Sequence, residues 1–345
     1  MSPKFRILSI DGGGLKGLIP LQVIKEIEII TNQPVHKTFD LIAGTSTGGL
    51  LTCALLLSDD TIEDNQRKYS LKQIEDIYLE KGKIIFPRYR YFKGVFMHTR
   101  KWIRPMYFGK NYEKVLCEYF TDHRITSCLK PIFITSFDIN RNIPAYFTYR
   151  EATLMDEYNS KLFDICKATS AAPTYFPTHN FFYNGESVVC IDGGLIMNNP
   201  SLGALVEVLG NTSYRNYKLN DKKVEIKDIA ILSLGTGISY DQYNSSSSEN
   251  WGRLQWIKKV IDISMGAPMR IVHDQLETIY KSIGLPNNYL RINVPIDKKY
   301  SDMDDSRDEA LNHYMQEAKS NITNNHTLKE RLRLFLIESG VNIPV

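Results

Sequence analysis

The sequence has few cysteines and little net charge, and it contains no long hydrophobic run. Its five cysteines form no C-x-x-C pair and no Cys/His cluster, so we expect buried free thiols rather than disulfides or a zinc site. A formal net charge of +3 gives no reason to expect a nucleic-acid partner. No apolar run approaches the ~18 residues that a membrane-spanning helix needs.

A signal-sequence pattern is also missing at the start of the sequence. Residues 1–6 lead directly into a predicted strand, so we expect no secretory signal and a cytoplasmic protein. The 345 residues, 43% of them hydrophobic, are enough for a sizeable core. No break in composition and no repeat divides them. We therefore expect one domain over 1–345, with a core at about 5–237 and a helical C-terminal part at about 251–340.

One interval, residues 81–112, has no acidic residue and is rich in Lys, Arg and aromatic residues. Basic and aromatic side chains together suit an anionic membrane interface, where each cation adds about 1 kcal/mol of attraction. A solvated insertion with a few aromatic residues packed inward explains the same composition. A phosphate-bearing ligand is a third interpretation. The interval is thus a candidate for transient, peripheral membrane contact.

Glycine is concentrated at predicted strand-to-helix turns. An apolar run at 39–43 stops at Gly44, and Ser46 then lies between Gly44 and Gly48 in a G-x-S-x-G pattern. A helix-compatible apolar segment follows at 50–57. Strand, sharp turn and helix is the context in which this pattern presents a serine nucleophile. The alternative is an ordinary turn in which Ser46 is only a helix N-cap.

A second glycine turn follows the first predicted strand, at residues 5–10. The segment Asp11–Gly17 reads D-G-G-G-L-K-G and precedes a helix predicted at about 18–30. The N–H groups of three consecutive glycines before a helix can converge on an anion, either a phosphate or the oxyanion of an acyl-transfer intermediate. The spacing also fits the G-x-G-x-x-G of dinucleotide binding. However, the second strand does not end in the acidic residue that would bind the ribose.

Strands and helices are predicted to alternate along the chain. Strands are predicted at 5–10, 39–43, 131–139, 146–149, 187–191 and 229–234. Helices are predicted at 18–30, 50–57, 71–81, 111–120, 162–170, 201–209, much of 251–282, and 325–339. The strands are apolar without alternation, which is typical of a parallel sheet buried on both faces. The pattern therefore predicts a layered α/β fold with a mainly parallel sheet.

The tetrapeptide Ile-Asp-Gly-Gly occurs twice, at 10–13 and 191–194, each time at the end of an apolar strand. Each copy could therefore place an aspartate at the edge of the sheet where ligands bind, close to Ser46. A serine nucleophile needs a base within hydrogen-bond reach. The spacing does not choose between Asp11 and Asp192, and Asp11 is also explained as a turn-former.

Histidine is the other possible base. Three histidines, His273, His313 and His326, follow Asp192 in the chain order of an α/β-hydrolase triad. That fold would place more of its sheet before the nucleophile than this sequence does. His273 moreover lies in a helical pattern, where an ordinary, partly buried histidine is the usual case.

Three ordered motifs resemble those of the patatin-like phospholipases: Asp11–Gly17, Gly44–Gly48 and Asp192–Gly194. Four further segments resemble others in that family, at 78–87, 169–177, 198–200 and 232–237. The resemblance implies a three-layer α/β/α fold and a catalytic Ser–Asp dyad that uses no histidine. It makes Ser46 the nucleophile and Asp192 the general base. It implies calcium-independent hydrolysis of fatty-acyl esters of phospholipids or lysophospholipids, with no metal and no cofactor.

The same resemblance implies roles for the glycines. It makes the N–H groups of Gly12, Gly13 and Gly14 the oxyanion donors, with Lys16 at the basic position of that motif. The residues that support the three motifs are Gly17, Gly44, Gly48, Gly193 and Gly194.

The sequence also resembles some bacterial patatin-like proteins of anti-phage systems, which are activated by cyclic nucleotides. The alternative function is therefore the same hydrolase, inactive until a nucleotide binds, with 81–112 contacting the nucleotide or lipid headgroups. A lipid-binding module without enzymatic activity is disfavoured because Ser46, Asp192 and the glycine loop are all intact.

Overall fold

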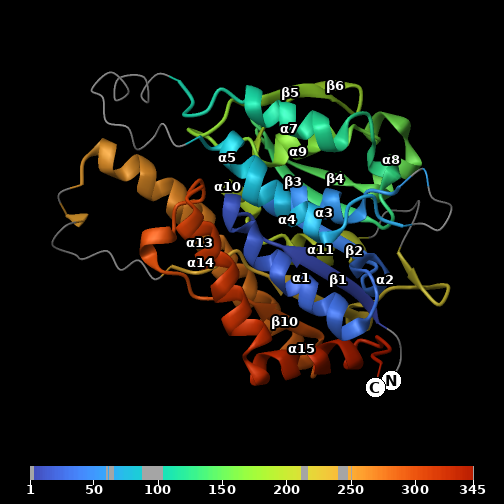
Figure 1. Cartoon of the computed structure of the whole chain (residues 1–345). Coiled ribbons are helices and arrows are strands. Elements are labelled where there is room, and N and C mark those ends of the chain that lie inside the picture. Colours follow the sequence, from blue (N-terminus) through green and yellow to red (C-terminus); the bar gives the residue numbers. More distant parts are fainter. Residues whose placement is uncertain are drawn as a thin grey trace.

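The computed structural model describes residues 4–59, 61, 66–87, 104–210, 217–239, 248–249 and 251–344. Within them, a mixed and mostly parallel sheet lies between helices (Figure 1). Its strands are β1 (Phe5–Ile10), β2 (Leu41–Thr45), β3 (Ile132–Asp138), β4 (Ile143–Thr148), β5 (His179–Tyr183), β6 (Glu186–Asp192), β9 (Ile229–Leu234) and β10 (Tyr289–Ile292). A separate small hairpin is formed by β7 (Lys218–Leu219) and β8 (Lys222–Lys223).

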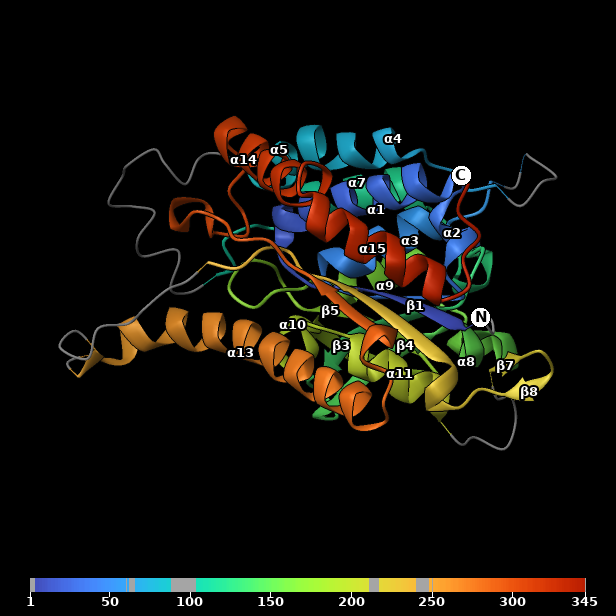
Figure 2. The ribbon, with the colours of Figure 1, turned by 90° about the horizontal axis from the view of Figure 1, so that it is seen from below.

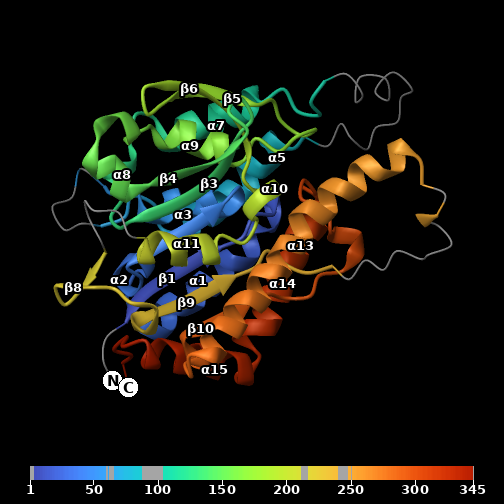
Figure 3. The same ribbon diagram turned by 180° about the vertical axis from the view of Figure 1, so that it is seen from behind.

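The helices lie on both faces of this sheet. They are α1 (Leu18–Thr31), α2 (Val35–Thr38), α3 (Thr47–Leu56), α4 (Leu71–Asp76), α5 (Gly82–Ile85), α7 (Lys110–Phe120), α8 (Tyr149–Leu154), α9 (Leu162–Thr169), α10 (Gly194–Met197), α11 (Ser201–Leu209), α13 (Arg253–Ser282), α14 (Asp308–Ala318) and α15 (His326–Glu338). Figure 2 shows α1, α3, α14 and α15 on one face, and α11 and α13 on the other. Figure 3 shows α11 and α13 across that second face.

The strand order is β10-β9-β1-β2-β3-β6-β5, and β4 pairs with the other edge of β3. Neighbours from β10 to β3 are parallel, whereas the pairs of β3 with β4 and β6, and of β5 with β6, are antiparallel. The predicted fold class, a three-layer α/β/α arrangement around a mainly parallel sheet, is confirmed.

The central strands are apolar on both faces because helices cover both faces. On β1, Leu8 joins the hydrophobic cluster that includes α1, α3 and α9, and the neighbouring Ile7 joins the cluster of α11 and α13. The same alternation holds for Leu232 and Ile231 on β9. Successive side chains of a strand point to opposite faces, so burial on both faces requires an unbroken apolar run. The apolar runs of the central strands therefore correspond to burial on both faces, as predicted.

Some elements differ from the predictions. The helix after Ser46 begins at Thr47, three residues before the predicted start, because the glycines of the turn are helical. The helix predicted at 71–81 consists of α4 and a π-helical turn at Ile77–Lys81. The strand β10 was not predicted, since it has four residues and a charged one among them. All five cysteines are free thiols, as predicted, but Cys117 is exposed.

The lengths and compositions of the described helices also bear on membranes. Within the ranges given above, no helix is both long enough and apolar enough to cross a bilayer.

Candidate active site

Ser46 is placed by a strained turn between β2 and α3. Its backbone angles are φ 53° and ψ −122°, in a region that a residue with a side chain rarely adopts. The turn is held from behind, because the Ser46 N–H donates to Thr169 Oγ1 at 2.8 Å. The Thr169 hydroxyl in turn donates to the carbonyl of Thr135 at 2.6 Å. Strain that the surroundings hold in place is common at active sites.

The glycines around Ser46 are needed for close packing. A Cβ atom on Gly48 would lie only 2.1 Å from the carbonyl oxygen of Ile10, and one on Gly44 only 2.2 Å from the carbonyl oxygen of Gly48. Helix α3 therefore begins in direct contact with the end of β1. This contact brings Ser46 beside the loop that follows β1.

Asp192 reaches Ser46 from the opposite direction along the sheet. On β3, Thr135 pairs with Thr45 at the end of β2, and the next residue, Ser136, pairs with Asp192 at the end of β6. The strand β2 is parallel to β3 and β6 is antiparallel, so the two strands run toward each other along the same edge of β3. They stop at adjacent positions, which brings Ser46, the residue after β2, beside Asp192, the last residue of β6.

The Ser46 hydroxyl donates a hydrogen bond of 2.7 Å to Asp192 Oδ2. The other carboxylate oxygen, Oδ1, accepts a bond of 2.7 Å from the N–H of Gly194. These two bonds orient the carboxylate toward the serine. Asp192 is only 1% exposed and Ser46 5%. Burial raises the pKa of Asp192 to about 6, although the bonds from Gly194 and Ser46 oppose this shift.

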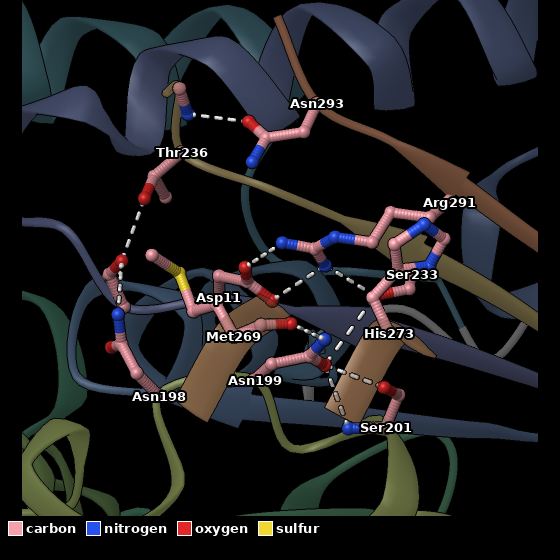
Figure 4. A network of polar contacts seen from close by, with 12 residues as sticks. Asp11, Asn198, Asn199, Ser201, Ser233, Thr236, Met269, His273, Arg291 and Asn293 are labelled. Atoms are coloured by element: carbon pink, nitrogen blue, oxygen red, sulfur yellow. Dashed lines mark hydrogen bonds and ion pairs between the residues drawn. The ribbon is translucent and has the colours of Figure 1, made fainter. Parts of the chain in front are cut away.

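Of the two aspartates that the sequence offered as a base, Asp11 is engaged elsewhere. Its carboxylate is paired with Arg291 of β10, which also donates from Nη1 to the hydroxyl of Ser233 at 2.7 Å (Figure 4). Asp11 is fully buried and Arg291 nearly so. Burial raises the pKa of Asp11 and is the largest influence on it, while the Arg291 guanidinium acts to lower it. The pair anchors the residue that begins the glycine loop.

In the glycine loop, one of the three predicted oxyanion donors is already bonded. The Gly12 N–H donates to the carbonyl of Asn198 at 3.1 Å in this structure. A Cβ on Gly12 would lie 2.2 Å from Asn198 Oδ1 and 3.2 Å from Ser46 Cβ, so Gly12 packs directly between them. Within the part of the chain that the structure describes, no hydrogen bond occupies the N–H groups of Gly13 and Gly14.

The loop is fixed from outside by a C-terminal segment. The Leu15 N–H donates to the carbonyl of Met303 at 2.8 Å, and Lys16 Nζ donates to the carbonyl of Ser301 at 2.9 Å. Burial lowers the pKa of Lys16, against the attraction of Asp302 and Asp262. The basic side chain predicted from the motif thus ties the loop to residues 301–303.

The remaining motif glycines also lie at close contacts. Gly17 faces Thr47 and Tyr78, and Gly193 faces Thr135.

Ser46 and Asp192 lie on the wall of a cavity whose empty space, together with the part open to solvent, is about 870 Å³. The cavity is bounded by α3, α4, α5, α7 and the loop after α9. Its lining is almost entirely apolar, with leucine, isoleucine, phenylalanine and tyrosine predominant. Two polar pairs on the wall satisfy each other: Thr47 with Tyr78 at 2.7 Å, and Tyr112 with Ser170. The cavity therefore presents hydrocarbon surface next to a serine hydroxyl.

The three histidines that follow Asp192 lie elsewhere. His273 Nδ1 is 3.1 Å from the hydroxyl of Tyr289, and burial lowers the pKa of the imidazole. His313 Nε2 accepts from the N–H of Asp297, and His326 is the exposed first residue of α15. No hydrogen bond links any of them to Ser46 or Asp192 among the described residues. For metals, the described residues contain no group of three or more His, Cys, Asp or Glu side chains placed to hold an ion.

Part of the basic and aromatic interval 81–112 falls outside the described residues, namely 88–103. In the described part, Lys81 pairs with Glu118 and Lys83 with Asp308. Phe86 and Tyr107 pack against Phe176 at the cavity. The predicted contacts of this interval with a membrane or a nucleotide remain predictions.

Three residues that support the site were not predicted from the sequence. Thr169 and Asn198 lie in segments that resemble the family, but nothing local assigns them to Ser46 or Gly12. Arg291 lies on the unpredicted strand β10. The one available signal for Arg291 was a charged residue inside an apolar segment, which usually has a buried partner.

A family model described as Patatin-like phospholipase matches residues 8–205, which include Ser46, Asp192 and the glycine loop. Patatin-2-Kuras 3 of Solanum tuberosum is 33% identical over 302 residues, covering 83% of this chain and 75% of that protein. Patatin-like protein 3 of Arabidopsis thaliana is 31% identical over 314 residues, covering 83% and 73%. A third relative, named Probable inactive patatin-3-Kuras 1, of Solanum tuberosum, is 31% identical over 301 residues, covering 83% and 77%.

Proposed function

The chain belongs to the patatin-like phospholipase family, and we propose that it hydrolyses fatty-acyl esters of phospholipids or lysophospholipids through Ser46 and Asp192. Membership of the family supports lipid acyl hydrolase activity. The observation that carries the finer proposal is the 2.7 Å hydrogen bond from Ser46 Oγ to a buried Asp192, on the wall of an apolar cavity. Because one similar relative is named as probably inactive, the proposal depends on the residues of the site and not on the family name alone.

The first half of the reaction is acyl transfer to the serine. As Ser46 Oγ attacks the ester carbonyl, its proton passes to Asp192 Oδ2 along the existing hydrogen bond. A free aspartate, with a pKa near ~3.9, is a weak base for this step. Its raised pKa, about 6, makes Asp192 a stronger base that is still ionised at neutral pH. The Gly13 and Gly14 N–H groups would stabilise the oxyanion, and the proton then passes from Asp192 to the departing lysolipid oxygen.

The second half releases the fatty acid. Asp192, ionised again, accepts a proton from a water molecule that attacks the acyl-Ser46 ester. The tetrahedral intermediate collapses, Ser46 Oγ regains its proton from Asp192, and the free fatty acid leaves. No step requires a calcium ion, since the acid–base work and the oxyanion contacts are assigned to the protein's own groups.

The cavity supports a substrate with a long hydrocarbon chain. Its lining is almost entirely apolar and includes Ser46 and Asp192, which is the arrangement expected for a site that binds a hydrocarbon chain beside reactive groups. A fatty-acyl chain can bury its methylene groups there, and the pairs Thr47/Tyr78 and Tyr112/Ser170 on the wall stay bonded to each other.

The test is release of fatty acid from mixed phospholipid vesicles, with and without a calcium chelator. The variants are Ser46→Ala, Asp192→Asn and the control Ser187→Ala, which removes an exposed serine on the same strand as Asp192. We expect chelator-resistant release by the wild type and by the control, and none by the two site variants. Release by a folded Ser46→Ala protein would contradict the assignment.

The nucleotide-gated alternative has its own outcome in this assay. It is supported if the wild type releases no fatty acid from vesicles until a cyclic nucleotide is added. Activity without any added ligand argues against gating.

A further inference from the structure

The long helix α13 passes the proposed catalytic pair and continues beyond it. The carbonyl of Met265 accepts a 3.1 Å hydrogen bond from Asn198 Nδ2, and the Met265 methyl group packs beside Gly194. The helix begins at Arg253, twelve residues earlier, which corresponds to about 18 Å of helix before this point. Figure 2 shows this first half of α13 projecting past the edge of the sheet.

An apolar, exposed stripe begins on the projecting half and continues for about two turns beyond Met265. The stripe consists of Trp256, Val260, Ile263, Ala267 and Ile271, which follow one another at intervals of three or four residues and so share one face. We call these five residues the outer stripe. Trp256 is 42% exposed, Val260 51%, Ile263 43% and Ile271 54%.

After Ile271, the same helix has the ordinary pattern of a surface helix. Its inward residues, Leu276 and Tyr280, are fully buried, and its outward residues, Asp274, Glu277 and Lys281, are polar and exposed. The outer stripe is therefore not a general property of α13. Its first three residues, Trp256, Val260 and Ile263, precede Met265 in the part of the helix that extends past Ser46 and Asp192, and the stripe ends at Ile271.

The surroundings of the stripe suit a lipid headgroup region. Two of the three tryptophans of the sequence lie at this end, with the rings of Trp251 and Trp256 5.2 Å apart. Tryptophan is enriched where hydrocarbon meets headgroups. Lys259 and Arg270 lie beside the stripe, whereas Asp262 lies about 120° around the helix from Trp256, on the side of Lys16. An apolar face flanked by cations is typical of helices that lie on anionic bilayers.

We propose that the outer stripe of α13 docks on the surface of an anionic lipid bilayer. This docking would bring the edge of the sheet that carries Ser46 close to the membrane. The proposal rests on the proposed function for its substrate. It concerns an element outside residues 81–112 and beyond the part of the chain matched by the family model.

The test measures binding separately from catalysis. In the Ser46→Ala background, which leaves lipid intact, the double variant Val260→Glu/Ile263→Glu is compared with the matched control Val206→Glu/Ile29→Glu. The control changes the same residue types to the same charge, at positions on α11 and α1 that are 60% and 71% exposed. Binding is measured by flotation with phosphatidylcholine vesicles, with and without phosphatidylglycerol.

We expect the parent and the control to float with vesicles that contain phosphatidylglycerol, and the stripe variant to bind at least about tenfold more weakly. Equal binding by the stripe variant and the control would overturn the proposal. So would no binding by the parent protein, or a change in oligomeric state in the stripe variant alone, which would make a second copy the occupant of the stripe.

Two further measurements test whether the active site of the stripe variant is intact and whether Trp256 itself contacts the bilayer. Hydrolysis of a soluble butyryl ester by the stripe variant, with Ser46 restored, reports whether the site is intact. The fluorescence of Trp256 should shift to shorter wavelength on the anionic vesicles, and Trp256→Phe should remove most of this shift. If binding depends on the stripe while no vesicle lipid is hydrolysed, the docking proposal stands and the proposed function fails.

Discussion

Neutralising Asp192 should abolish turnover and stabilise the folded protein at neutral pH. Burial raises the pKa of this carboxyl from an ordinary value of 3.8 to about 6, so the folded state binds its proton more tightly than the unfolded state does. Ionisation of Asp192 therefore costs stability, and the cost develops as the pH rises from about 4 to above 6. A difference of roughly two pKa units corresponds to about 3 kcal/mol.

The variant Asp192→Asn removes this cost and keeps an oxygen that can accept from Ser46 or Gly194. At pH 7.5 it should be more stable than the wild type by up to about 3 kcal/mol, or about 4 °C in Tm for a chain of this length. Near pH 4 the wild-type carboxyl is largely protonated. The difference should then shrink to about 0.5 kcal/mol.

The assay is thermal unfolding of both proteins at these two pH values, with Asp138→Asn as the control. Burial alone would raise the pKa of Asp138, but hydrogen bonds from Arg141 and from two backbone N–H groups hold it below the ordinary value. Removing that charge should therefore destabilise the protein at neutral pH. An Asp192→Asn protein that unfolds at or below the wild-type temperature at pH 7.5 would refute the argument that Asp192 is a desolvated base.

Three other predictions follow from the same contacts. The kcat/KM for a soluble ester should rise with pH, reach half its plateau near pH 6 and level off about one pH unit higher, as Asp192 loses its proton; a profile that is flat across that range would contradict its role as base. Arg291→Met leaves Asp11 buried without its partner and should lower the free energy of unfolding by about 3–5 kcal/mol in a denaturant titration, whereas Asp11→Asn/Arg291→Met should recover most of the loss. Ala54→Phe fills part of the cavity and should reduce kcat/KM for palmitoyl esters far more than for butyryl esters; an equal loss for both would place the acyl chain elsewhere.

The turn around Ser46 was predictable because it is encoded locally. Five residues, Gly44 to Gly48, contain both the serine and the glycines that the turn needs, and the apolar run before them identifies the strand. Likewise, the central strands were visible because burial on both faces leaves a run of apolar residues. Predictions of this kind need no knowledge of the strand order.

The choice between Asp11 and Asp192 was not available from the residues alone. Both end an apolar strand in the same tetrapeptide, and only the resemblance to a family favoured Asp192. In the structure, the register along β3 brings Asp192 to Ser46, while a strand 280 residues away from Asp11 supplies the arginine that pairs with it. The bonded N–H of Gly12 has the same origin, since its partner Asn198 is 186 residues distant.

Several features of the site lower the stability of the fold. The sign of a variant's effect on stability should therefore distinguish the residues proposed to react from those that hold them in place. A non-glycine residue at positive φ, such as Ser46, costs of order 1 kcal/mol or more, and a desolvated carboxylate costs more still. Removing the charge of Asp192 should therefore raise stability and remove activity together. Removing Thr169, which holds the Ser46 turn, or Arg291, which holds Asp11, should lower stability, because each leaves a buried partner unsatisfied. Opposite signs of the change in unfolding free energy, measured in one set of variants, would distinguish the two roles without any assay of the reaction.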